Sequence, residues 1–327
     1  MIFDLHCDTL LGLHRAKKRG EPSCFQKASL QIDEQKLIKG GYFVQCFAAF
    51  VPAAETEPYS LLSELIDVYE ETVASSAVLQ PVLRFSDFEK NNKAGKISSV
   101  LTMEDAAPIG NCLPRLREVF HRGVRMIGLT WNYPNAVGYP NYQNFILGKK
   151  PDLFTPETEL GLTEFGKELV EEMNALGIVI DVSHLSDKGF YDVIEGSKKP
   201  IMASHSNARG LCRNVRNLTD DMLKRLAKNG GVIGMNCAKG FLCEDEERGR
   251  KTLSWLIAHM KYVKKKIGAE HIGLGSDFDG IDPNIELADA SYMPRLLVEM
   301  EKAGFTSEEI EKITYQNALR VFKENML

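Results

Sequence analysis

Short runs of apolar residues recur along the whole chain, and stretches with the hydrophobic period of a helix separate them. The runs are rich in Val, Ile and Phe, and several are apolar at almost every position, which is typical of parallel strands buried on both faces. We predict eight strands from them, at residues 2–6, 42–47, 99–103, 124–130, 178–183, 201–204, 232–236 and 272–276.

The stretches between these runs carry the signals of amphipathic helices. Residues 163–176 are an example, because Leu169, Val170 and Met173 fall on one helical face and Gly177 follows as a stop signal. The predicted helices lie at residues 33–39, 59–77, 113–121, 163–176, 187–195, 220–228, 252–266 and 307–322.

This alternation of strands and helices predicts an α/β fold with a parallel sheet, and eight such units predict a closed (β/α)8 TIM barrel. The alternative is an open doubly wound sheet, but no glycine-rich phosphate-binding loop follows the first strand. Because a barrel needs roughly 250 residues, we expect a single domain over residues 1–327. The additional length falls in a long loop at residues 131–161, after the fourth strand, and in extra C-terminal helices.

The composition excludes several classes of protein. With 44% hydrophobic and 26% charged residues and a formal net charge of −5, the chain is too apolar to be disordered. A pI near 5.9 without long basic runs argues against a nucleic-acid-binding protein. No apolar stretch approaches the roughly 20 residues of a membrane-spanning helix, and no signal peptide is recognisable. Seven scattered cysteines without a CxxC pair favour a reduced, cytoplasmic protein.

Polar residues that can bind metal or transfer protons follow the predicted strands. In a barrel the carboxyl ends of all strands meet at one mouth, which holds the active site. We therefore expect these side chains to converge, although they are far apart in the sequence. The candidates are His6 and Asp8 after the first strand, Glu104 after the third, His184 after the fifth, His205 after the sixth and Asp277 after the eighth.

The types and spacing of these residues predict a two-metal site. His6 and Asp8 are two positions apart in a strand, so both point to the same side and can reach one ion. The two oxygens of Glu104 can bridge two divalent ions roughly 3.5 Å apart. Zinc suits nitrogen and oxygen ligands of this kind, while ligand type alone leaves manganese and iron open. Asp277 is then the candidate proton shuttle. Taken singly, each residue also has an ordinary structural interpretation, such as a hydrogen-bonded core histidine.

Six motifs occur in order along the chain: Leu5-His6-Cys7-Asp8, Thr102-Met103-Glu104, Asp181-Val182-Ser183-His184, Ser204-His205-Ser206, Arg216-Asn217 and Gly275-Ser276-Asp277-Phe278-Asp279-Gly280. Together they resemble the membrane dipeptidase family, also called renal dipeptidase or peptidase family M19. The resemblance covers almost the whole chain and is strongest over residues 161–236, which begin with Gly-Leu-Thr-Glu-Phe-Gly.

The resemblance implies a barrel of the metal-dependent hydrolase type that binds two zinc ions and forms a homodimer. It assigns the catalytic aspartate to Asp277 and the arginine that holds the substrate's α-carboxylate to Arg216. A guanidinium suits that role because its planar fork binds a carboxylate through two hydrogen bonds. The implied zinc ligands are His6 and Asp8 for the first ion, Glu104 as the bridge, and His184 and His205 for the second.

Two positions depart from the pattern of the family. Trp131 stands where characterised members carry a histidine that contacts the scissile carbonyl, and an indole donates one hydrogen bond but does not titrate. Phe241 replaces a tyrosine that lines the substrate pocket. The animal members are lipid-anchored and secreted, whereas this chain shows neither signal and looks like a bacterial, cytoplasmic form.

Residues and resemblance together predict a zinc-dependent dipeptidase in which a metal-bridging hydroxide attacks the peptide bond, including bonds to a C-terminal D-residue. Trp131 motivates an alternative, a binuclear-metal amidohydrolase that acts on N-acyl amino acids or lactams. A third interpretation is a metal-binding barrel without catalysis, and Asp277 beside all the ligand candidates counts against it. The expected partner is a small-molecule substrate, a dipeptide, with neither nucleic acid nor membrane bound.

Overall fold

Eight parallel strands close into a barrel in this computed structural model, which describes residues 1–21, 25–142, 152–245 and 251–326. Each strand of the ring pairs with the strand that precedes it and the strand that follows it in the sequence, including the second with the third. Pairing of the first strand with the last closes the ring. The TIM barrel prediction is thus confirmed, and the open doubly wound sheet is excluded. The strands are β1 (Ile2–Asp4), β2 (Tyr42–Ala49), β4 (Ile97–Met103), β5 (Val124–Gly128), β6 (Val179–Asp181), β7 (Met202–Ser206), β8 (Val232–Met235) and β9 (Ile272–Leu274).

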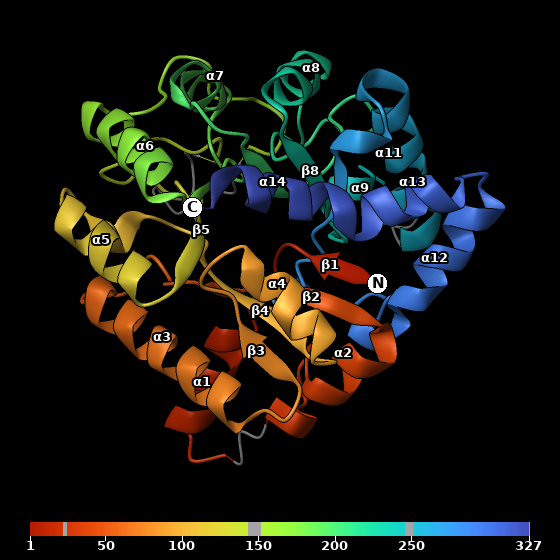
Figure 1. Ribbon diagram of the computed structural model, residues 1–327. Helices are drawn as coiled ribbons and strands as arrows, with labels where there is room; N and C mark the ends of the chain where they lie inside the picture. The colour runs from red at the N-terminus through yellow and green to blue at the C-terminus, as the bar shows by residue number, and fades with distance from the viewer. Residues whose placement is uncertain (22–24, 143–151, 246–250, 327) are drawn as a thin grey trace.

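Helices surround the ring of strands (Figure 1). Each of the predicted helices is present, although residues 307–322 form two α-helices joined by a π-helical turn at Lys312–Gln316. The helices are α1 (Thr9–Lys18), α2 (Glu34–Gly40), α3 (Pro58–Ser75), α4 (Ser86–Lys93), α5 (Leu113–His121), α6 (Glu164–Leu176), α7 (Asp187–Gly196), α8 (Asp220–Asn229), α9 (Lys239–Leu242), α11 (Thr252–Ile267), α12 (Met293–Lys302), α13 (Ser307–Glu311) and α14 (Asn317–Asn325).

Five elements were absent from the predicted set, namely α1, α4, α9, α12 and the short strand β3 (Leu79–Pro81), which pairs with β4 outside the ring. In α1 the apolar residues fill the first half and the cations the second, so no complete helical period is visible. In α4 only one apolar side chain, that of Phe88, is available to be buried. Tertiary packing stabilises such short elements although their own periodicity is weak.

Three phenylalanine side chains fill the end of the barrel where the strands begin. The ring of Phe322 in α14 stacks on that of Phe3 in β1 at 5.5 Å, and Phe88 from α4 lies 5.8 Å from both. All three are buried among residues from most of the barrel strands. Helix α14 runs across this end of the ring in Figure 1. The barrel is therefore closed here, and only its other end is available for a site.

The long loop predicted after the fourth strand is confirmed over its described parts, residues 131–142 and 152–161, which contain no helix or strand. Isolated bridges join Gly138 to Leu162 and Pro140 to Leu185. The amide of Asn141 donates to the carbonyls of Leu185 and Val215, so the loop is fixed to the segments that follow β6 and β7. Residues 143–151 lie outside the described part of the chain.

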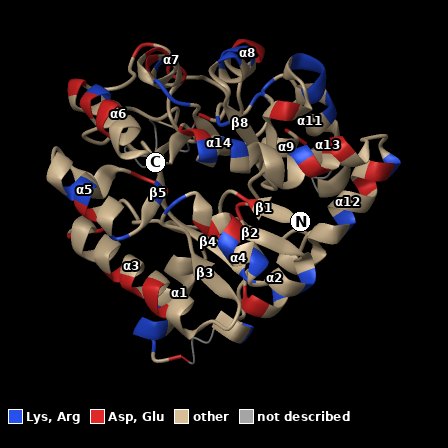
Figure 2. Cartoon of the chain, in the orientation of Figure 1, with Lys and Arg blue, Asp and Glu red and all other residues tan. Residues whose placement is uncertain are grey.

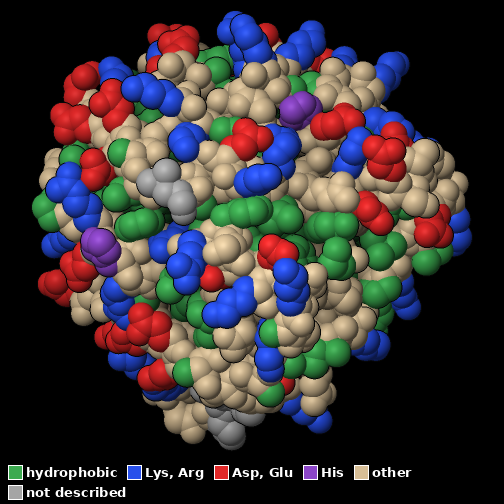
Figure 3. Space-filling model, in the orientation of Figure 1, with side chains coloured by type: hydrophobic (Ala, Val, Ile, Leu, Met, Phe, Trp, Pro, Cys, Tyr) green, Lys and Arg blue, Asp and Glu red, His purple; other side chains and the backbone are tan. Residues whose placement is uncertain are grey.

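The surface mixes charges of both signs. Acidic and basic side chains alternate on the outer helices and on the face seen in Figure 3, without a large area of one sign (Figures 2 and 3). None of the helices in the described residues has the length and apolar character needed to cross a bilayer.

Removing one of the three phenylalanine side chains that fill this end of the barrel should destabilise the fold without changing the structure of the opposite end. We expect Phe322→Ala to lower the free energy of unfolding by about 3–5 kcal/mol, because it removes a large buried side chain and leaves a cavity. The measurement is chemical denaturation. The matched control is Phe154→Ala, at a side chain that is 51% exposed, with an expected loss of about 0.5 kcal/mol. Equal losses of unfolding free energy in the two variants would contradict the role of Phe322 in closing the barrel.

Candidate active site

The first predicted ligand pair lies at the open end of the barrel. His6 and Asp8 follow β1, and the Nε2 atom of His6 lies 3.5 Å from Oδ2 of Asp8. The same nitrogen lies 3.8 Å from Oε1 of Glu104, after β4, and 3.9 Å from Oδ1 of Asp277, after β9. Three carboxylates from three parts of the chain thus surround one imidazole.

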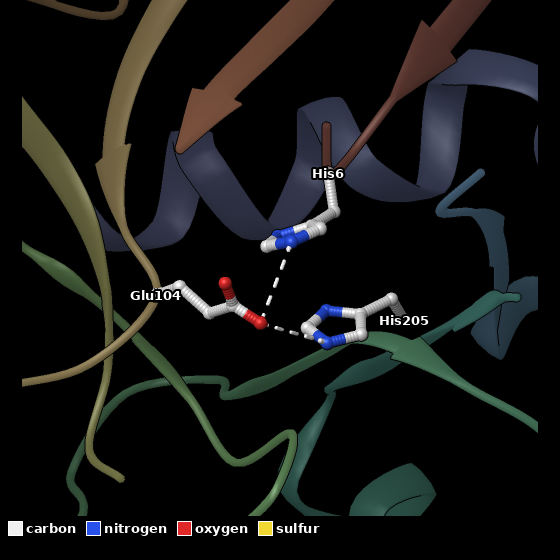
Figure 4. Close-up of side chains that lie close together, drawn as sticks. All are labelled: His6, Glu104 and His205. Carbon is white, nitrogen blue, oxygen red and sulfur yellow. Dashed lines mark ion pairs between the residues drawn. The ribbon is translucent and has the colours of Figure 1, made fainter. Parts of the chain in front are cut away.

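The second histidine pair lies on the other side of Glu104. The Oε1 atom of Glu104 is 3.1 Å from Nε2 of His184 and 3.8 Å from Nε2 of His205, and Figure 4 shows the contact with His205. The ring of His205 also stacks on that of His6, with centroids 3.9 Å apart. One carboxylate oxygen is therefore shared by three imidazoles, which is the position that a bridging ligand requires.

Hydrogen bonds to the Nδ1 atoms of these two histidines fix which ring nitrogen carries the proton. Nδ1 of His184 donates to Oδ1 of Asn132 at 2.8 Å. Ser204 gives its hydroxyl proton to Oδ2 of Asp181 at 2.5 Å, so its oxygen accepts from Nδ1 of His205 at 2.8 Å. This assignment follows from the hydrogen-bond network. Both Nε2 atoms then present lone pairs, as metal ligation needs.

The two Nε2 lone pairs face each other at 3.0 Å, next to the Glu104 carboxylate. Such an arrangement is repulsive unless a cation lies between the groups. Nε2 of His6 and Oδ1 of Asp8 are buried without any hydrogen-bond partner among the described residues. The ligand atoms of His6, Glu104 and His205 lie within 4.8 Å of one another, as do those of His6, Asp8 and Asp277. The donor set therefore fits divalent cations.

Burial sets the electrostatics of the cluster. It raises the pKa of Glu104 well above its usual range, with the charges of Asp8 and Asp277 adding to the effect. Burial also raises the pKa of Asp277, to about 6. It lowers the pKa of His205 and that of His184, which keeps both rings neutral.

His6 differs from the other two histidines. Burial lowers its pKa, but the nearby carboxylate of Asp8, with the charges of Glu104 and Asp277, outweighs burial and raises it to about 10.

Two buried aspartates hold neighbouring strand ends together by the same pattern of hydrogen bonds. Asp4 accepts from the backbone N–H of Ser276 at 2.8 Å and from its hydroxyl at 2.5 Å, which ties β1 to the segment after β9. Asp181 accepts from the backbone N–H of Ser204 at 2.9 Å and from its hydroxyl, which ties β6 to β7. These pairs had no predicted role. Each aspartate lies two or three positions before a candidate histidine in the sequence, and this spacing is the local signal from which the pairs could have been inferred.

The backbone is strained at the site. His184, Asp277 and Asp279 have φ values of 71°, 62° and 66°, and they are the only residues other than glycine with positive φ in the described parts of the chain. Such conformations cost free energy and concentrate at functional sites. Gly280 follows in the same turn. A residue with a side chain would clash there, because its Cβ would lie 2.1 Å from Oδ2 of Asp8.

A pocket of about 320 Å³ opens above the cluster. The predicted residues Arg216, Trp131 and Phe241 all line it. Arg216 is 3% exposed, its Nε atom has no hydrogen-bond partner among the described residues, and its guanidinium lies 5.2 Å from the ring of Phe241. Residues of the pocket wall that the sequence analysis missed are Leu11, Arg15, Phe50, Asn132 and Ile281.

Trp131 forms part of an aromatic wall of the pocket. Its ring lies 4.9 Å from that of Phe50, 5.5 Å from Tyr133 and 6.2 Å from His184. The indole thus stands beside the predicted second metal position, where the family histidine was expected, and it supplies an apolar surface there.

Comparison with known proteins identifies the family of the chain. A family model for membrane dipeptidase (peptidase family M19) matches residues 1–326. An uncharacterized dipeptidase of Schizosaccharomyces pombe is 37% identical over 312 residues, which cover 90% of this chain and 72% of that protein. An uncharacterized protein encoded in the pqqA 5′ region of Klebsiella pneumoniae is 34% identical over 269 residues, covering 82% and 97%.

A solved structure extends the comparison to three dimensions. The metallopeptidase from Rhodobacter sphaeroides, liganded with a phosphinate mimic of the dipeptide L-Ala-D-Ala, superposes with a TM-score of 0.87. It is 26% identical, and the match covers 99% of both chains. The chain belongs to the membrane dipeptidase family, peptidase family M19, and is a metal-dependent hydrolase of peptide bonds.

Proposed function

We propose that the protein is a dipeptidase that uses two zinc ions. His6 and Asp8 would hold one ion, His184 and His205 the other, and Glu104 both. The observation that carries the proposal is the position of Oε1 of Glu104, between 3.1 and 3.8 Å from three imidazole nitrogens, of which Nε2 of His6 has no hydrogen-bond partner among the described residues. When bound, two such ions supply a nucleophilic water at neutral pH and polarise the scissile carbonyl.

Arg216 supports a substrate with a free C-terminus. Its guanidinium is buried, and burial lowers its pKa, so the desolvated cation gains by pairing with an anion. Nη2 donates to the carbonyl of His205 at 3.5 Å, while Nε has no partner among the described residues. A carboxylate in the pocket would satisfy this group through charge-assisted hydrogen bonds. The small volume of the pocket limits the substrate to a short peptide.

The surroundings of Asp277 support a role in proton transfer. The amide of Asn236 donates to its Oδ2 atom at 2.9 Å and fixes the carboxylate, while Oδ1 faces His6 and the cluster. A pKa raised to about 6 by burial suits a group that takes a proton and then returns it near neutral pH. In the proposed reaction, Oδ1 accepts the proton of the attacking water and delivers it to the leaving amine.

The stereochemistry at the C-terminal residue forms part of the proposal. The metallopeptidase from Rhodobacter sphaeroides binds a mimic of L-Ala-D-Ala and shares the fold over almost its whole length. This supports dipeptides with a C-terminal D-residue as substrates of the present chain. Homodimerisation and a cytoplasmic location stay predictions from the sequence.

A second candidate function keeps the metals and changes the substrate. Phe50 and Trp131, which both line the pocket, offer apolar surface to an acyl group, and indole cannot titrate as the family histidine does. This favours hydrolysis of N-acyl amino acids or lactams as the alternative.

Metal analysis together with a dipeptide library tests the main proposal. We expect about two zinc ions per chain and release of amino acids from dipeptides, including L-Ala-D-Ala. A chelator should abolish the activity, and added zinc should restore it. If the metal-loaded protein cleaves N-acyl amino acids or lactams but no dipeptide, the alternative function is correct.

Loss of the buried guanidinium should reveal the carboxylate contact. Arg216→Ala should reduce kcat/KM for free dipeptides by about 10–100-fold, mainly through KM, and should affect C-terminally amidated dipeptides far less. Arg213→Ala is the control, since Arg213 pairs with Glu244 at the surface. Equal losses on free and amidated substrates would contradict the assignment.

The Ser204 hydroxyl should strengthen metal binding through His205. Ser204→Ala removes the acceptor of Nδ1, and we expect metal affinity to fall by about 10–100-fold in competition with a chelator. Ser206→Ala is matched to it, because Ser206 lies in the same strand and its buried hydroxyl has no hydrogen-bond partner in the described structure. A comparable loss in both variants would argue against the Ser204 contact.

A further inference from the structure

The substrate pocket contains a second guanidinium, which the function proposed above does not use. Arg15 belongs to α1 and lines the pocket together with Leu11 from the same helix and Ile281 from the segment after β9. Arg216 reaches the pocket from the segment between β7 and α8. Arg15 is exposed and Arg216 is buried, so one cation lies at the mouth of the pocket and the other in its wall.

Arg15 differs from the other cations at the end of α1. Arg15 has no ion pair with any residue in the part of the chain that the structure describes, and it is the one that lines the pocket. The other three each pair with a glutamate at N–O distances of 2.5 to 3.0 Å: Lys17 with Glu71, Lys18 with Glu64, and Arg19 with Glu21.

The acidic side chains of the pocket are engaged elsewhere. Oδ1 of Asp279 accepts from the backbone N–H of Gln31 at 2.6 Å, and Oδ2 accepts from the hydroxyl of Thr9 at 2.7 Å and the N–H of Ile32 at 3.3 Å. Asp8 belongs to the metal cluster described above, as do the remaining pocket carboxylates. No carboxylate of the described pocket wall is therefore left to neutralise Arg15.

We propose that Arg15 binds a second carboxylate of the substrate, so that the pocket prefers dipeptides with an acidic side chain. The inference rests on the proposed function, in which Arg216 holds the α-carboxylate. A guanidinium at the pocket mouth can bind a side-chain carboxylate through two parallel hydrogen bonds. Because Arg15 is exposed, its contribution is moderate and falls with salt.

Pairs of isosteric substrates test this preference, because Glu and Gln differ in charge and hardly in size. The first pair is L-Glu-L-Ala and L-Gln-L-Ala, and the second is L-Ala-D-Glu and L-Ala-D-Gln. In the native protein we expect the Glu peptide of at least one pair to have about fivefold higher kcat/KM. Arg15→Gln should bring this ratio to about one, and Arg15→Glu should invert it. Raising the salt concentration to about 0.5 M should shrink the native ratio.

Lys18→Gln is the matched control, because it removes the same charge from the same helix, at a side chain that pairs with Glu64. It should leave the ratio unchanged, and an equal loss in this variant would overturn the proposal in favour of a general field effect. Hydrolysis of the Gln peptides with Glu to Gln ratios near one in both pairs would overturn it while leaving the dipeptidase function intact. Failure to cleave any dipeptide would overturn both.

Discussion

The structure depends on a group of buried ionisable side chains that would repel one another if nothing compensated their charges. The carboxylates of Asp8, Glu104 and Asp277 and the rings of three histidines are buried together at one end of the barrel, with Nε2 of His184 and Nε2 of His205 only 3.0 Å apart. In a medium of low dielectric constant such groups repel strongly unless cations compensate them. Divalent metal binding turns this repulsion into ligation, and the membership of the metal-dependent M19 family agrees with that outcome.

The barrel supplies the rigidity that such a cluster needs. The ligands lie at or just after the carboxyl ends of β1, β4, β6 and β7, so their positions depend on how accurately neighbouring strand ends are held. The pairs Asp4–Ser276 and Asp181–Ser204 fix two of these junctions with buried hydrogen bonds. At the opposite end, Phe322 fills the interior and closes the barrel. Among the described residues, those other than glycine with positive φ are His184, Asp277 and Asp279, in turns where the surrounding contacts over-determine the backbone.

The pocket contains the groups that would orient a substrate over the cluster. Arg216, in the wall, suits the carboxylate at one end of a short peptide, and Arg15 stands at the mouth. The aromatic wall around Trp131 lies beside His184, so the groups that select a substrate and those that hold metal share one cavity.

The sequence by itself determined the eight barrel strands and the polar residues that follow them, because a buried strand is recognisable from a short local run. Residues so placed, from His6 to Asp277, had to meet once the ring closed. Only the tertiary structure decided the rest. Helix α1 has too little periodicity of its own, and its Arg15 enters the pocket because the helix packs beside β2 and α3. The hydrogen bond from His184 to Asn132 and those between Asp4 and Ser276 join segments 52 and 272 residues apart. Such contacts produce no periodic pattern in the local sequence. They form only when the pairing of β1 with β9 and of β2 with β4 closes the ring and brings distant segments together.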